Sequence, residues 1–169
     1  YKGKVFERLG QFADYAKANN VILLHENEKG IYGEKATECR EIMDAFRGEH
    51  FKAIFDFANF VQADQDTLEA YEILKADIAY IHVKDAIKAT GQVVPAGMGD
   101  GNVEAILKDL YANGFKGFLS LEPHLFNFTG FAGLEKGESS IGNGPAKVLS
   151  GDEAFTLAHE FLKKILEKL

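Results

Sequence analysis

Four side chains that can bind metal ions follow four short apolar segments of the chain: Glu26, Asp56, His82 and Glu122. Each segment has the length and the β-branched or aromatic content of a strand that is buried in a parallel sheet. The carboxyl ends of parallel strands meet at one rim of the sheet, where α/β folds place their chemistry. The pattern therefore predicts that the four side chains converge at that rim.

Three carboxylates and one imidazole in contact favour a divalent cation. Two carboxylates about 4 Å apart repel by about 4 kcal/mol at an effective dielectric constant of about 20, and a bound cation removes this cost. Oxygen ligands with one imidazole suit Mn²⁺, Mg²⁺, Co²⁺ or Zn²⁺. The alternative for any single acid is a solvated loop residue or a helix cap, which is the commoner role. Four endings of the same kind favour one divalent metal ion.

The apolar segments are predicted strands, and helices are predicted around them. The strands cover residues 21–24, 51–55, 78–82 and 118–121. The helices cover residues 2–19, 37–46, 66–75, 103–113 and 152–169. Asp66 with Glu69, and Ser150 with Glu153, are predicted capping pairs at helix starts. Helices that alternate with short buried strands imply a parallel sheet with right-handed crossovers.

The length of the chain limits this α/β fold of parallel βα repeats to a single domain over residues 1–169. Each βαβ unit needs about 30 residues or more, so four units fill the chain. A closed TIM (β/α)8 barrel has eight strands and about 250 residues. Two arrangements stay open at this point. One is a complete open four-stranded sheet, and the other is half of a barrel whose first half lies elsewhere.

Composition and charge narrow the class of protein. With 46% hydrophobic residues, the chain can form one buried core. Its formal net charge of −7, with scattered Lys and Arg, argues against nucleic acid or a membrane surface as partner. No apolar run approaches the roughly 20 residues of a membrane span, and the first residues do not resemble a signal peptide. Cys39, the single cysteine, allows no internal disulfide and fits a soluble, cytoplasmic protein.

Five motifs, in this order, resemble the second half of the xylose-isomerase-like sugar isomerase and epimerase barrels. They are L-L-H-E-N-E at 23–28, D-F-A-N at 56–59, I-H-V-K-D at 81–85, G-x-G-x-G at 97–101 and L-S-L-E-P-H at 119–124. This superfamily includes ketose 3-epimerases, hydroxypyruvate isomerases, inosose dehydratases and endonuclease IV. The resemblance covers nearly the whole chain and implies the C-terminal, four-stranded half of a TIM barrel. The N-terminal half would come from an upstream segment or from a homodimer partner.

The resemblance also implies an activity. Glu26, Asp56, His82 and Glu122 would ligate one divalent metal ion, and Glu26 and Glu122 would form an acid/base pair beside a keto-sugar or sugar phosphate. Proton transfer through an enediolate would then give an epimer or an isomer, and loss of a β-hydroxyl would make the enzyme a dehydratase. A non-catalytic α/β module that binds metal or ligand is the alternative. A DNA-repair nuclease fits poorly, because such sites use three metals, additional histidines and a basic groove.

Two further substrate-binding candidates come from the resemblance. Asn59 stands three residues after Asp56, where many members have a histidine that contacts substrate. Lys88 stands six residues after His82, near the place where epimerases often carry a substrate-binding arginine, although lysine lacks the bidentate fork of arginine.

Three more candidates come from their positions at strand ends. Lys84 and Asp85 either orient substrate or pair with each other where the third strand ends. His124 follows Glu122 by two residues, a spacing that would turn it toward the pocket, but Pro123 between them breaks the strand alternation. The glycines at 97, 99 and 101 precede a helix, so they either cradle a phosphate or form a plain loop.

Overall fold

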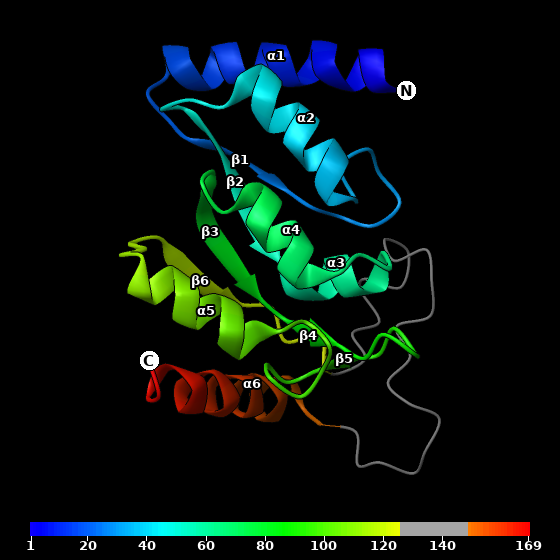
Figure 1. Ribbon diagram of the computed structural model, residues 1–169, viewed down its shortest axis with the longest axis vertical. Coiled ribbons are helices and arrows are strands. Elements are labelled where there is room, and N and C mark those ends of the chain that lie inside the picture. Colours follow the sequence, from blue (N-terminus) through cyan, green and yellow to red (C-terminus); the bar gives the residue numbers. More distant parts are fainter. Residues whose placement is uncertain (126–148) are drawn as a thin grey trace.

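The computed structural model describes residues 1–125 and 149–169, in which helices and strands alternate along the chain (Figure 1). Within these residues, four strands form one parallel sheet in the order β1-β2-β3-β6. The strands are Leu23–Glu26 (β1), Phe51–Asp56 (β2), Ile78–Val83 (β3) and Phe118–Leu121 (β6). This arrangement confirms the predicted α/β fold of parallel βα repeats and is that of a partial TIM barrel.

Six helices and a small hairpin complete the part of the chain that the structure describes. The helices are Lys2–Ala18 (α1), Ala36–Phe46 (α2), Phe57–Gln62 (α3), Thr67–Leu74 (α4), Val103–Ala112 (α5) and Gly151–Leu166 (α6). The hairpin pairs Asp85–Ala86 (β4) with Val93–Val94 (β5) in antiparallel register. Among the described helices, none has the length and apolar character needed to cross a membrane.

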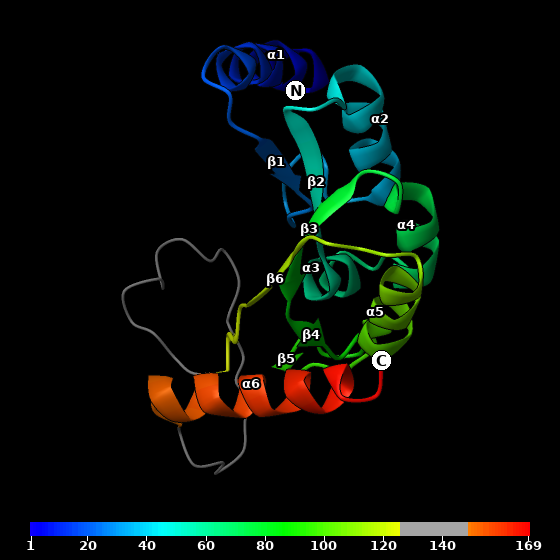
Figure 2. The ribbon, with the colours of Figure 1, turned by 90° about the vertical axis from the view of Figure 1, so that its left-hand side faces the viewer.

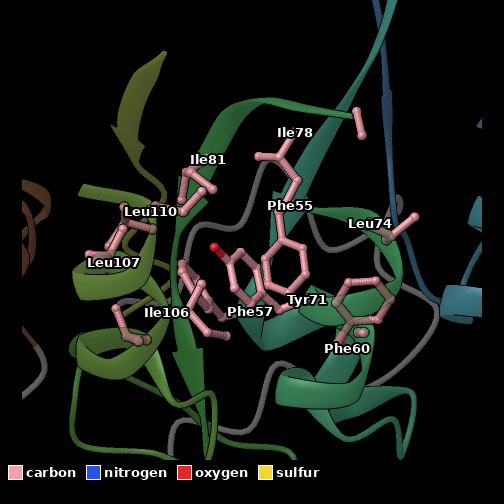
Figure 3. Packing of buried hydrophobic residues seen from close by; sticks show 14 of the residues in the cluster. Phe55, Phe57, Phe60, Tyr71, Leu74, Ile78, Ile81, Ile106, Leu107 and Leu110 are labelled. Atoms are coloured by element: carbon pink, nitrogen blue, oxygen red, sulfur yellow. The ribbon is translucent and has the colours of Figure 1, made fainter. Parts of the chain in front are cut away.

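The hydrophobic core lies between the sheet and the helices α2, α4 and α5, which follow one face of the sheet (Figure 2). Strand β2 alternates between the core, where Phe55 is fully buried, and the opposite face of the sheet. The rings of Phe55, Phe57 and Tyr71 lie together in this core, and Ile106 and Leu110 approach them from α5 (Figure 3). The core thus fixes the strands whose carboxyl ends carry the polar residues.

Two predicted capping sites are present. Ser150 and Glu153 form a complete capping box at the start of α6. Asp66 accepts a hydrogen bond from the backbone amide of Glu69 at the start of α4, at 2.8 Å. Both helices therefore begin where the sequence pattern places their caps.

The first strand begins later than predicted. Pairing with β2 starts at Leu23, opposite Phe51, whereas Val21 and Ile22 are 50% and 58% exposed. The backbone amide of Val21 donates to Ala16 at the end of α1 instead of to a strand. The prediction of a buried strand over residues 21–24 is therefore wrong for its first two residues.

Helix α3 and the β4-β5 hairpin are absent from the predicted elements. The side chain of Asp56 accepts a hydrogen bond from the Asn59 amide at 2.7 Å, which starts α3 directly at the end of β2. One residue therefore ends a strand and caps a helix. An apolar helix of six residues is too short to show a helical period in the sequence.

Candidate metal centre

The ends of the strands bring the four predicted metal ligands together. Glu26 and Asp56 are the last residues of β1 and β2, His82 lies near the end of β3, and Glu122 directly follows β6. Asp56 and His82 are paired across the β2-β3 ladder. Each of the four side chains offers one ligand atom, and these atoms all lie within 4.8 Å of one another. We call these four residues the metal centre. Their roles stay predictions.

His82 lies between two carboxylates. Its Nδ1 is 2.9 Å from Glu26 Oε1 and 3.0 Å from Glu122 Oε1. The hydrogen bond that the ring donates to Glu26 raises the pKa of His82 above its ordinary value, and the negative charges around the ring raise it further, whereas burial lowers it. A ring nitrogen carries at most one proton, which can point at only one of the two oxygens.

Asp56 is the most deeply buried member of the metal centre, with 0% exposure. Its Oδ1 accepts the hydrogen bond from Asn59, and its Oδ2 lies 3.1 Å from the ammonium of Lys84. That Oδ2 nevertheless has no hydrogen bond of good geometry. Burial raises the pKa of Asp56 to about 7, against the opposing effect of Lys84.

The donor set of the metal centre fits a divalent cation. Carboxylate oxygens and an imidazole nitrogen are the ligands that Mg²⁺, Mn²⁺ and Zn²⁺ take in proteins. A cation would satisfy both oxygens beside His82, where one proton satisfies one of them. It would also offer a partner to a buried Asp56 oxygen that lacks a hydrogen bond.

Lys84 belongs to the same cluster. Its side chain is 4% exposed, and its Nζ lies 3.1 Å from both Asp56 Oδ2 and Glu122 Oε2. His82 and Lys84 are two residues apart on one strand segment, so they point to the same side. That spacing is the signal in the sequence that places Lys84 beside the ligands. The hypothesis that Lys84 pairs with Asp85 is wrong.

Asp85 points to a glycine-rich loop. Its carboxylate is 0% exposed and accepts hydrogen bonds at 2.8–3.0 Å from the backbone amides of four residues. The donors are Ala86, Gly97, Gly99 and Gly101. The expectation that Asp85 contacts substrate is therefore corrected, because all of its polar capacity holds the loop. The glycine amides likewise point at Asp85, so they do not form a phosphate cradle.

We expect Gly99→Ala to lower the free energy of unfolding by about 1–3 kcal/mol. A Cβ atom at Gly99 would overlap the Ala86 carbonyl oxygen and would lie 2.5 Å from Asp85 Oδ1. Urea unfolding followed by circular dichroism measures the loss. Gly3→Ala is the matched control, because its Cβ meets no atom within 4 Å and alanine favours helix α1. Equal effects of the two substitutions would contradict the role of Asp85 as the anchor of the loop.

Asn59 and Asn27 form hydrogen bonds with two of the candidate ligands, Glu26 and Asp56. Asn59 is 2% exposed, and its Nδ2 donates to Glu26 Oε1 at 3.3 Å and to the Asn27 carbonyl oxygen at 3.0 Å. Asn59 thus contacts the side chain of a candidate ligand, and its predicted contact with substrate stays a prediction. Asn27 pairs with both backbone groups of Asp56, at 2.9 and 3.0 Å. Sequence reasoning missed Asn27, whose only signal is its place next to Glu26.

Lys88 and His124 are both exposed to solvent. The ammonium of Lys88 pairs with Asp64 at 2.9 Å, and both side chains are exposed. The backbone amide of His124 donates to the Glu122 carbonyl oxygen at 2.8 Å, and the residue is exposed. The substrate-binding roles of Lys88 and His124 stay predictions.

Comparisons with known proteins agree with this fold. The model of the family described as "Xylose isomerase-like TIM barrel" matches residues 1–144. The structure of a D-tagatose 3-epimerase-like protein aligns with a TM-score of 0.67 and 20% identity, over 96% of this chain and 53% of that one. A comparison with curated proteins gives no significant match.

Two other solved structures align comparably. A xylose isomerase-like TIM barrel protein from Mycobacterium smegmatis, in complex with magnesium, has a TM-score of 0.61 and 17% identity, over 96% of this chain and 48% of that one. A probable 3-DHS dehydratase from Bacillus anthracis has a TM-score of 0.60 and 17% identity, over 72% of this chain and 51% of that one. The chain thus spans about half the length of the structures that it resembles.

Proposed function

Because the chain belongs to the xylose isomerase-like TIM barrel family, we propose that it carries the metal centre of a sugar isomerase or epimerase. The substrate would be a keto-sugar or a sugar phosphate. The observation that carries this proposal is the convergence of Glu26, Asp56, His82 and Glu122 at one end of the sheet. A bound divalent cation would polarise the carbonyl group of the substrate and stabilise negative charge on its oxygen.

Glu26 and Glu122 are the residues that we propose for proton transfer. They come from the two outer strands of the sheet, and both carboxylates contact Nδ1 of His82. Their side chains are 28% and 30% exposed, whereas Asp56 is fully buried. Of the three carboxylates, the two glutamates are therefore the ones that a substrate could meet from the solvent side of the described structure. One would remove the proton next to the carbonyl, and the other would return a proton to the opposite face to give an epimer. If a single base returned the proton to the neighbouring carbon instead, the product would be an isomer.

Solvent isotope exchange tests this function. The full-length protein, loaded with Mn²⁺, is incubated with a panel of ketoses and ketose phosphates in D₂O, and deuterium uptake next to the carbonyl is followed by NMR. We expect uptake with at least one sugar, and a loss of about 10²–10⁴-fold in Glu26→Gln. Glu104→Gln, which changes a surface residue paired with Lys168, is the control. Mn²⁺ binding without uptake by any sugar would favour a non-catalytic metal-binding module.

The pH dependence of metal binding follows from the two perturbed groups. On folding without metal, the pKa of Asp56 rises from 3.8 to about 7, so this group costs stability as pH rises through that interval. The pKa of His82 rises above 6.5, so its stabilising effect is present below pH 6.5 and is lost as pH rises through the folded value. Mn²⁺ requires both groups to be deprotonated.

We therefore expect the rise in melting temperature on addition of MnCl₂ to grow from about pH 6 to about pH 8. Differential scanning fluorimetry of metal-stripped protein, with and without MnCl₂, measures it. A metal-induced rise that stays constant over this interval would show that Asp56 and His82 do not release protons to the ion.

The rest of the barrel is also part of the proposal. Within the described residues, β1 and β6 each pair with a neighbour on one side only. We propose that a second half barrel pairs with these edges, supplied either by an upstream segment of the polypeptide or by a second copy of this chain. Sedimentation of the 169-residue chain separates the two sources, because only a second copy gives a dimer.

A further inference from the structure

We propose that Lys84 is the internal counter-ion of the metal centre, which holds two of its ligands in place whether or not a metal ion is bound. The inference rests on the proposed metal-binding function and adds a positioning residue to it. Lys84 would act on Asp56 and Glu122 rather than on substrate, since its side chain is 4% exposed and its ammonium contacts both carboxylates.

The place of Lys84 in the sheet suits this role. It follows the central strand β3 directly, and Asp56 and Glu122 come from the ends of the strands on either side. Its ammonium bridges these two neighbours, at 3.1 Å from each. One lysine therefore ties three strand ends together at the rim of the sheet.

The oxygen atoms of the two carboxylates are divided between partners. Glu122 directs Oε1 to His82 and Oε2 to Lys84, at 3.0 and 3.1 Å. Asp56 directs Oδ1 to the Asn59 amide and Oδ2 to Lys84. Lys84 thus fixes the rotation of the Glu122 carboxyl group by a hydrogen bond, which leaves the oxygen beside His82 for a metal ion. Toward Asp56 it acts as a neighbouring positive charge, at 3.1 Å and without a hydrogen bond of good geometry.

The charge balance of the cluster also supports Lys84 as the counter-ion of the metal centre. Three carboxylates and one ammonium leave two negative charges when His82 is neutral, which a divalent cation balances. Without the ammonium, the loaded centre would keep one negative charge in a largely buried place. Without metal, Lys84 is the permanent positive charge in contact with Asp56 and Glu122. The metal-free protein should therefore depend on Lys84 more than the metal-loaded protein does.

The test compares melting temperatures of the full chain after chelation and after loading with Mn²⁺. We expect Lys84→Met to lower the melting temperature of the metal-free protein by about 10 °C, because two carboxylates lose a buried partner. With Mn²⁺ bound, we expect the deficit to shrink to about half or less, since the ion supplies positive charge to the same carboxylates. A side chain that only fills space would give the same deficit in both states.

Lys88→Met is the matched control, because it removes an exposed lysine that pairs with Asp64 at the surface. It should change the melting temperature of neither the metal-free nor the Mn²⁺-loaded protein. If Lys84→Met lowered the melting temperature equally with and without Mn²⁺, or did not lower it at all, the proposed role of Lys84 would be overturned.

If Lys84→Met and Lys84→Gln do not stay folded after chelation, both are refolded from urea. Recovery only with MnCl₂ supports the role, and no recovery in either condition overturns it. If MnCl₂ does not raise the melting temperature of the unmodified protein, the metal centre itself fails instead.

Discussion

Glu122→Gln should weaken Mn²⁺ binding by about 100-fold or more, because even residues that only support metal ligands commonly contribute 10–100-fold to affinity. The change keeps the shape of the side chain and removes its charge. It also places an amide between His82 and Lys84, which lie 3.0 and 3.1 Å from the two Glu122 oxygens. Isothermal titration of metal-stripped protein with MnCl₂ measures the loss.

Glu104→Gln provides the control for this titration. It also changes a glutamate to glutamine, but its side chain is 49% exposed and pairs with Lys168 on the surface. Its Mn²⁺ affinity should equal that of the unmodified protein. A Glu122→Gln protein that keeps its circular dichroism spectrum and binds Mn²⁺ with undiminished affinity would remove Glu122 from the set of ligands.

Phe55→Ala should lower the free energy of unfolding by about 3–5 kcal/mol, a large share of the about 5–15 kcal/mol of a typical domain. Phe55 is 0% exposed, and its ring centre lies 5.3 Å from that of Phe57, 5.0 Å from Phe60 and 6.2 Å from Tyr71. Deleting the ring leaves a cavity behind the strand that ends in Asp56. Urea unfolding of the 169-residue chain measures the effect.

Phe118→Ala is the companion substitution for Phe55→Ala. Phe118 also lies on a strand of the sheet, but it is 75% exposed, and its ring centre lies 5.9 Å from that of Tyr80. Its loss should change the free energy of unfolding by about 0.5 kcal/mol or less. Comparable losses at the two positions would contradict the placement of the core between the sheet and its helices.

The convergence of the four candidate ligands could be predicted from the sequence because polar residues follow the apolar strand segments, whereas their role in binding metal stays a prediction. Each of Glu26, Asp56, His82 and Glu122 follows a β-branched or aromatic run, and parallel pairing then carries the four to one rim. The contacts among them depend on rotamers and register, which no local pattern specifies. The position of Lys84 between Asp56 and Glu122 is such a case, although its spacing from His82 gives the face on which it lies.

Other features could not be predicted from the sequence, because one residue has two structural roles or because contacts between distant residues determine the local structure. Asp56 ends β2 and caps α3, so the chain turns without the glycine or proline that usually marks a boundary. Asp85 binds amides that lie 12 to 16 residues further along the chain, a distance beyond any local pattern. Val21 and Ile22 look like a buried strand because the apolar run cannot show where pairing with β2 begins.

Calorimetric titration of the metal-stripped, full-length protein with Mn²⁺, repeated with Mg²⁺, Zn²⁺ and Co²⁺, tests the central claim most directly. We predict that at least one of these ions binds with a stoichiometry of one per chain, and that Asp56→Asn abolishes this binding because it neutralises the most buried ligand. If none of the four ions binds to correctly folded protein, Glu26, Asp56, His82 and Glu122 do not form a metal centre.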